Sequence, residues 1–469
     1  MHDTRAEKKN YRNLFIALGC IATYILLVSL PTPAGLPFAG QKALALMVAV
    51  IIAWIFEVVP IGMASALAIM LLPTLGIVSM KDAMASFGIT TVFFILASFC
   101  FAGAFIITGL GYRVGLSISG MFGKSSHKVL LAFMVSTAAV SAVLADIPTA
   151  IVFASIAYPI LKKNGCEPGR SKFGMAMMMG IQIAAALGGL GTPAGSGLNV
   201  LALNLLKSTA HVDVNFIQWT VVGLPFAAIM TLVAWFVLTK MIPSEIDQVK
   251  GLDDAKAERE KLGPMSVQEK AFSAIFAGVM ILWFTSIFTG LDIAVIAIIG
   301  ATLLFFPGID ILTWDKIKYR IGWNVLLLVG ASNALAMAMT SQHGSAWIAD
   351  ILLGRLAGTG AVVLLGATLA FGIYSHLILP VGSATLAVAI PVIGLLAAKA
   401  GVNPALLVVP LAFTASCVFL VPVDPIPLST YQYGYWKMTD MMKPGFVISI
   451  VWLVLLTAVM LLASSVGLF

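Results

Sequence analysis

A series of apolar runs, each about as long as a membrane-spanning helix, occupies most of the chain. A helix that crosses the hydrocarbon core of a bilayer needs about 20 predominantly apolar residues. Only 10% of the residues are charged, whereas a water-soluble domain contains roughly a quarter, so lipid must surround most of the surface. The sequence therefore predicts an all-α, polytopic membrane protein, with candidate spans at 13–30, 42–59, 61–79, 88–110, 129–146, 173–191, 214–241, 271–289, 292–306, 322–341, 361–379, 404–421 and 445–467.

The charged residues gather at a few places outside these runs. The N-terminal segment 1–12 is rich in Lys and Arg, and the preference of basic residues for the cytoplasmic side predicts a cytoplasmic N-terminus at the inner membrane. The segment 243–270 holds 12 of the 47 formal charges. We expect it to be a polar linker between two membrane repeats, 13–242 and 271–469. The basic residues form no stripe with interleaved aromatic residues, so no nucleic-acid partner is expected.

An internal repeat relates the two halves of the chain. Three prolines of the first half are separated by 11 and 34 residues, and three prolines of the second half repeat both spacings at an offset of 232 residues. A repeat inside an apolar chain is typical of secondary transporters, whose related units meet at the membrane midplane. If each repeat holds an odd number of crossings, the second is inverted; a duplicated bundle without transport is the other interpretation. The prolines are Pro148, Pro159 and Pro193, and Pro380, Pro391 and Pro425.

Four segments interrupt the apolar pattern, and they occupy matching positions in the two repeats. A hairpin-like turn at 145–151 is matched by 379–385, and a polar, Gly- and Pro-rich stretch at 188–199 is matched by 421–430. Backbone without helical hydrogen bonds cannot face lipid, so these segments must be buried in protein or line an aqueous cavity. The free N–H groups of half-helices attract anions, and unwound carbonyls attract cations. We therefore expect re-entrant hairpins and broken helices that meet at a binding site, although kinking for packing alone is the simpler interpretation of any single segment.

Few ionisable residues lie within or beside the apolar runs, and these are functional candidates. They are Glu57, Asp146, His376 and Asp424. Asp146 stands two residues before the first hairpin proline, and Asp424 directly precedes a proline of the last break; either could bind a proton or a cation, or could cap a half-helix. His376 could be a structural residue or a substrate ligand. No arginine in the apolar runs stands out as a carboxylate clamp, so neutral donors and helix ends are expected to hold an anion.

Several motifs, taken in order, resemble those of the divalent anion:sodium symporter family of di- and tricarboxylate and sulfate carriers. The segment 54–60 reads W-I-F-E-V-V-P, and 188–199 is similar to the family's G-G-x-G-T-P-x-G-x-x-x-N break. The segment 322–330 resembles the later W-x-x-L-L-L-x-G helix, and 434–445 resembles G-Y-x-x-x-x-D-x-x-K-x-G. The resemblance covers about residues 40 to 465.

The resemblance implies a homodimer in which a transport part moves against a scaffold as an elevator. It also implies hairpin tips with the sequence Ser-Asn-Thr, which hold substrate carboxylates and two sodium ions. The aligned tips here are 149–151, Thr-Ala-Ile, and 381–383, Val-Gly-Ser, and the asparagine is missing from both. Asp146 and Asp424 could have taken over cation binding, of sodium or of a proton.

The breaks and the resemblance together give two groups of candidate site residues. The substrate candidates are Thr149, Ala150, Ser383, Ala384, Thr385, Thr192, Pro193, Ser196, Asn199, Pro425, Ser429 and Thr430. The candidates for a coupling cation, Na⁺ or H⁺, are Asp146, Gly191, Gly195, Gly382 and Asp424. No other metal and no organic cofactor are expected.

The function predicted from these features is cation-coupled, elevator-like transport of a small organic anion of the di- or tricarboxylate type. A sodium-independent anion exchanger, or a carrier that moves arsenite or exchanges protons, is the nearest alternative. An intramembrane enzyme is a remote one, because the sequence shows no HExxH or GxSxG pattern and its five histidines are scattered. A passive structural or sensor protein would show no stabilisation by a substrate.

Overall fold

The computed structural model describes residues 4–119, 123–356, 359–376, 382–416, 419–420 and 425–469. Within these residues the regular structure is helical, apart from one isolated bridge between Ser125 and Gln248, so the all-α prediction is confirmed. Seven helices of the described part are long and apolar enough to cross a bilayer. The helices are α1 (Thr4–Ser29), α2 (Phe38–Ile55), α3 (Ile61–Thr74), α4 (Met80–Phe87), α5 (Thr90–Ile107), α6 (Leu110–Ser119), α7 (Ser126–Ser141), α8 (Asp146–Lys163), α9 (Lys172–Gly189), η1 (Pro193–Gly195), α10 (Gly197–Ala210), α11 (Phe216–Met241), α12 (Leu252–Lys261), α13 (Val267–Phe284), α14 (Ser286–Thr289), α15 (Ile293–Leu303), α16 (Trp314–Ile317), α17 (Trp323–Ser341), α18 (Gly344–Leu356), α19 (Ala361–Ser375), α20 (Gly382–Lys399), α21 (Pro404–Ala415), α22 (Pro425–Tyr431) and α23 (Met438–Ser465).

Two helices lie where the sequence predicted turns and no spans. α8 begins at Asp146 and α20 at Gly382, so much of each expected hairpin turn forms the first turns of a helix. Pro148 is tolerated because an N–H in the first turn would have no acceptor within the helix. The helices also continue through Pro159 and Pro391. The absence of α8 and α20 from the list of expected spans is therefore an error, caused by reading these prolines as helix ends.

The helix boundaries keep the register of the proline repeat. α3 begins at Ile61 and α15 at Ile293, which are 232 residues apart, and the same offset separates Lys172 at the start of α9 from Pro404 at the start of α21. The pairs α2 and α13, α5 and α17, and α7 and α19 follow in the same order. The sequence repeat is thus a repeat of helices as well as of single residues.

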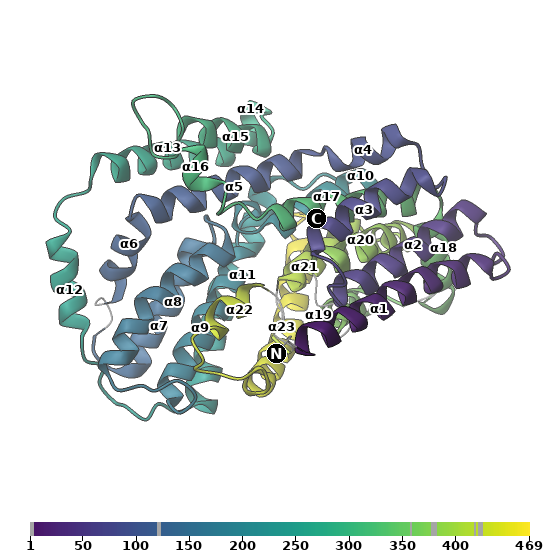
Figure 1. Cartoon of the computed structure of the whole chain (residues 1–469). Coiled ribbons are helices and arrows are strands. Elements are labelled where there is room, and N and C mark those ends of the chain that lie inside the picture. The colour runs from purple at the N-terminus through teal and green to yellow at the C-terminus, as the bar shows by residue number, and fades with distance from the viewer. Residues whose placement is uncertain (1–3, 120–122, 357–358, 377–381, 417–418, 421–424) are drawn as a thin grey trace.

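Counterpart helices of the two halves pack in exchanged pairs. α3 packs against α17, and its counterpart α15 packs against α5. In the same way α10 packs against α20, while α22 packs against α8. Figure 1 shows α1 to α3 with α17, α18 and α20 at one end of the molecule, and α13, α15 and α16 along α5 towards the other. A two-fold relation between the halves produces such an exchange, and inversion of the second half across the membrane stays a prediction.

The polar linker contains the helix α12 and ends at an ion pair with α6. Arg113 Nε lies 2.7 Å from Glu269 Oε1, and Arg113 Nη2 lies 3.1 Å from Oε2. Arg113 Nη1 also donates to the carbonyl of Gly263 at 2.8 Å. The Glu269 side chain is only 5% exposed and accepts a second bond from the N–H of Ser266, at the N-terminal cap of α13. This two-point contact holds the junction of the linker and α13 against α6.

The clamp at Arg113 predicts a change in stability. Arg113→Ala is expected to lower the unfolding temperature by roughly 3–6 °C, because Glu269 would remain buried without its charged partner. Arg113→Lys should restore only part of the loss, since an ammonium group lacks the planar fork. Thermal unfolding in detergent measures the effect. Lys207→Ala, which breaks the exposed pair with Asp213, is the control and should shift the midpoint by less than about 1–2 °C. Equal shifts for Arg113→Ala and Lys207→Ala would contradict the clamp.

Candidate functional site

A cavity of about 660 Å³ lies where the interrupted segments of both halves meet. Its described lining includes Asp146 at the start of α8 and Ser196 in the first Gly- and Pro-rich break. It also includes Ser383 in the first turn of α20 and Ile426 in α22. The volume is in the range of small-molecule binding sites. Each of the four interrupted segments therefore contributes side chains or backbone to one cavity.

Side chains hold the first break open in the protein interior. Between α9 and α10 the chain forms only the short turn η1. Asn199 Nδ2 donates to the carbonyls of Gly189 and Thr192, both at 2.8 Å. Thr192 Oγ1 donates to the carbonyl of Ala142 at 2.5 Å, which joins the break to the end of α7. Thr192 and Asn199 therefore satisfy unwound backbone, as any break at membrane depth requires, and neither lines the cavity.

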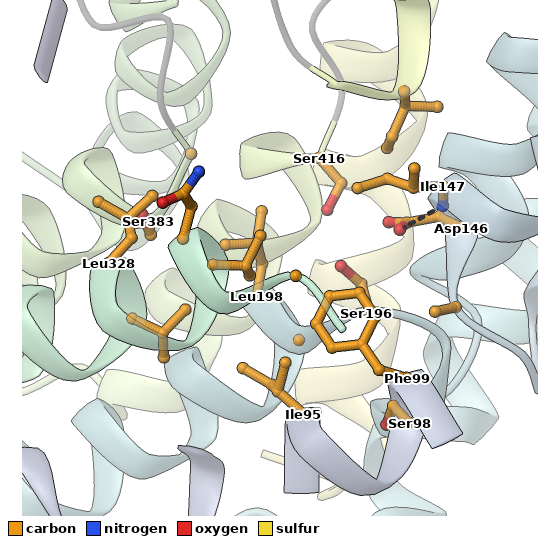
Figure 2. Close-up of a pocket in the computed structure, with 18 of the residues that line it drawn as sticks. Ile95, Ser98, Phe99, Asp146, Ile147, Ser196, Leu198, Leu328, Ser383 and Ser416 are labelled. Carbon is orange, nitrogen blue, oxygen red and sulfur yellow. Dashed lines mark hydrogen bonds between the residues drawn. The ribbon is translucent and has the colours of Figure 1, made fainter. Parts of the chain in front are cut away.

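Asp146 presents a carboxylate to the cavity from the first position of α8. Its Oδ1 accepts a hydrogen bond from the N–H of Ile147 at 2.8 Å, and the residue is only 7% exposed. Figure 2 shows Ser196 and Ser416 beside it on the same part of the wall. The break comes this close because it carries glycine: a Cβ atom on Gly189 would lie 3.2 Å from Asp146 Oδ2. Asp146 is thus packed against unwound backbone of the other interrupted segment.

Two serine hydroxyls in the cavity wall have no hydrogen-bond partner in the described part of the chain. Ser383 is 2% exposed and Ser416 is 3% exposed. Both line the cavity, Ser383 from the first turn of α20 and Ser416 from the C-terminal end of α21 (Figure 2). A buried hydroxyl without a partner is costly, so a ligand that accepts hydrogen bonds would relieve this cost.

Other predicted site residues lie behind the wall. Thr149 donates to the carbonyl of Ala145 at 3.0 Å, and Ser429 donates to that of Ile426 at 2.6 Å. Thr430 accepts from Trp436 Nε1 at 3.3 Å. Of the predicted residues only Asp146, Ser196, Gly382 and Ser383 line the cavity; a contact of the others with substrate or cation stays a prediction. The residues outside the lining are Thr149, Ala150, Gly191, Thr192, Pro193, Gly195, Asn199, Ala384, Thr385, Ser429 and Thr430.

Two predicted residues cannot be placed. Asp424 lies outside the described residues. Pro425 begins α22, and only its backbone belongs to the described part of the chain. Of the other ionisable candidates, His376 is buried with its Nε2 atom 3.0 Å from the carbonyl of Thr414 and does not line the cavity. Glu57 does line it.

Several lining residues were not predicted as ligands. They are mostly apolar and include Phe99 and Leu328, together with the polar residues Asn324 and Ser416. Their sequence context is uniformly apolar, so nothing distinguishes a cavity-facing side chain from a lipid-facing one. Glu57 carried a usable signal, because an acidic residue inside an apolar motif is uncommon. Its φ of 46° marks a sharp turn after α2, and sequence alone does not indicate where this turn points.

Comparison with known proteins agrees with this architecture. The sodium:sulfate symporter transmembrane region matches residues 8–466. A sodium-dependent dicarboxylate transporter, SdcS of Staphylococcus aureus, is 27% identical over 92% of this chain and 86% of its own. A membrane protein of Cupriavidus necator is 26% identical over 86% of this chain and 83% of its own.

Solved structures show the same kind of fold. The YdaH transporter of Alcanivorax borkumensis superposes with a TM-score of 0.56 at 14% identity, over 82% of this chain and 87% of that one. MtrF of Neisseria gonorrhoeae superposes with a TM-score of 0.50 at 13% identity, over 96% and 94%. Because the family match spans nearly the whole chain, the resemblance drawn from the motifs is confirmed, and the chain is a multi-pass membrane transporter, not an enzyme, that belongs to the sodium:sulfate symporter family.

Proposed function

We propose that this protein carries a small organic carboxylate across the membrane together with sodium, by exposing the cavity alternately to the two sides. The observation that carries the proposal is the cavity itself, which the interrupted segments of both halves line with one buried carboxylate and two hydroxyls without partners. Transporters of inverted-repeat type bind substrate and coupling ion at such helix breaks. The relationship to a sodium-dependent dicarboxylate transporter supports the coupling ion and the class of anion.

Sodium is proposed to bind at Asp146. No Lys, Arg or His belongs to the described lining of the cavity, and a buried carboxylate without a cation is strongly unfavourable. Oxygen atoms that suit a hard cation lie nearby, because a Cβ atom on Gly189 would be 3.1 Å from the carbonyl oxygen of Gly195 and 3.2 Å from Asp146 Oδ2. Asn199 Oδ1 is also buried and has no hydrogen-bond partner in the described part of the chain. Together these groups can neutralise and hold one cation.

The substrate carboxylate is proposed to bind at Ser383 and Ser416. Both hydroxyls can donate to an anion, and the first turn of α20 adds N–H groups and the positive end of the helix dipole. Bound sodium would offset the repulsion between this anion and the Asp146 carboxylate. Binding of each ion therefore favours binding of the other, which is the thermodynamic basis of symport.

The motion and assembly are also proposals. The family resemblance favours an elevator in a homodimer, with the N-terminus on the cytoplasmic side of the inner membrane. The exchanged packing of α3 on α17 and of α15 on α5 supports a two-fold arrangement in which one group of helices could move as a unit against the rest.

Uptake by proteoliposomes tests the proposal. The purified chain is supplied with labelled succinate, citrate or hexanoate, with and without an inward sodium gradient, and with a proton gradient in place of sodium. The proposal expects sodium to stimulate uptake of at least one of these acids. Uptake that responds only to the proton gradient, or only to an unlabelled anion on the opposite side, would replace sodium symport by proton coupling or exchange. No uptake under any condition would remove the carrier assignment for these acids.

A further inference from the structure

The polar groups of the cavity are unevenly distributed. The buried hydroxyls of Ser383 and Ser416 and the buried carboxylate of Asp146 belong to interior lining residues. The exposed lining residues include Glu57 and Asn324, which therefore mark the side of the cavity that is open in this structure. A carboxylate bound at the two serines would extend the rest of its molecule away from this interior group.

Apolar side chains surround the path that the rest of the molecule would follow. Figure 2 shows Leu198 between Ser383 and Asp146, with Ile95 and Phe99 below it and Leu328 beside Ser383. These side chains offer hydrocarbon and aromatic surface and no hydrogen-bonding group. A second charged group on the substrate would have to leave water beside this surface, which costs several kcal/mol when no partner is present.

The charge of the cavity also disfavours a second carboxylate. Asp146 and Glu57 line it, and no Lys, Arg or His belongs to its described lining. The chain segments 377–381, 417–418 and 421–424, which adjoin lining residues in the sequence, contain no basic residue either, and the last contains Asp424. A single sodium ion at Asp146 would balance that carboxylate. A substrate with two carboxylates would then place one of them near the acidic side chain of Glu57 without a cation.

We infer that the preferred substrate is a monocarboxylate with an apolar body of about five or more carbons, and not a short dicarboxylate. The inference rests on the proposed carrier function and narrows its substrate. The carboxylate accepts hydrogen bonds from Ser383 and Ser416, and the hydrocarbon body contacts Ile95, Leu198 and Leu328. The cavity volume of about 660 Å³ accommodates such a body.

Matched acids test the inference on the unmodified full-length chain in saturating sodium chloride. Isothermal titration or thermal shift compares butanoate, hexanoate and octanoate with hexanedioate and butanedioate. We expect hexanoate to bind at least tenfold more tightly than hexanedioate. Each added methylene should improve affinity about fourfold until the apolar walls are covered. A diacid that binds as tightly as the monoacid of equal length, or more tightly, overturns the inference while the carrier function stands. If no acid binds in sodium, the carrier proposal fails as well.

Two variants separate the carboxylate end from the apolar body. Ser383→Ala should weaken butanoate and octanoate by the same factor, because both lose one hydrogen bond to the carboxylate. Leu328→Ala should weaken octanoate at least fivefold and butanoate less than twofold. Val454→Ala, at a side chain 63% exposed on α23, is the control and should change neither. Equal weakening of both acids by Leu328→Ala would overturn the contact with the apolar body, even if hexanoate is preferred over hexanedioate.

Discussion

Asp146→Asn is expected to abolish the stimulation of transport by sodium and to weaken sodium binding about 100-fold. The magnitude corresponds to about 3 kcal/mol, the usual effect of removing one member of a buried ion pair. The reason is that Asp146 is the only buried acidic residue in the described lining of the cavity. Sodium-dependent uptake into proteoliposomes, and the shift of the unfolding temperature by sodium relative to potassium, both measure the effect.

Asparagine is chosen because it separates the two roles that the sequence left open for this residue. An asparagine at the start of a helix accepts the same backbone hydrogen bond as an aspartate, so a purely capping Asp146 would tolerate the change. Asp315→Asn, which alters a side chain 86% exposed, serves as a control for loss of an acidic group. An unchanged sodium response of Asp146→Asn would assign the residue to the cap of α8 and contradict the proposed sodium site.

Gly195→Ala is expected to prevent assembly of the first break. A Cβ atom at this position would lie 2.4 Å from the carbonyl oxygen of Gly189 and 2.8 Å from that of Ser141. Both are backbone atoms, so neither can move aside as the end of a flexible side chain could. The cost should reach or exceed about 3 kcal/mol, the upper end for overpacking a tight interior. The substitution also displaces carbonyls proposed to hold sodium, so sodium-dependent uptake should be lost even in protein that folds.

The control for Gly195→Ala is a glycine with free space around it. Gly366 lies inside α19, and a Cβ atom there would have no neighbour within 4 Å outside its own helix. Gly366→Ala should therefore stabilise the protein by about 0.5–1 kcal/mol through helix propensity. Thermal unfolding and uptake are measured for both variants. A Gly195→Ala protein with normal stability and normal sodium response would show that the break does not need its close backbone contacts.

The sequence was most informative where it breaks its own pattern. The matching prolines and the polar stretch at 188–199 pointed to interrupted helices, and the structure places residues of these segments around one cavity. The physical reason is that unwound backbone needs partners wherever water is absent, so its polar residues stand out from an apolar background. Thr192 and Asn199 stood out for this reason, although their hydrogen bonds go to the backbone of the break and not to the cavity.

The sequence was least informative about which side chains face the cavity. Leu328 and Phe99 look like any other residue of an apolar helix, because lipid, core and substrate all accept the same surface. Ser416 lies at the end of α21 without any polar neighbour that marks it. α8 and α20 were missed for a related reason: the strongest local signal was proline, and proline in a first turn does not end a helix. Only the packing of the two halves identifies the cavity wall.

Labelling of a cysteine at Ser383 tests the central claim most directly. Ser383→Cys is introduced into a chain whose native cysteines, Cys20, Cys100, Cys166 and Cys417, are replaced, and an impermeant thiol reagent is applied from each side of sealed proteoliposomes. If the interrupted helices form one cavity that opens alternately, the reagent modifies this cysteine from both sides, and sodium with a bound carboxylate slows the modification at least tenfold. Modification from one side only, at a rate that sodium and carboxylate leave unchanged, would contradict the account.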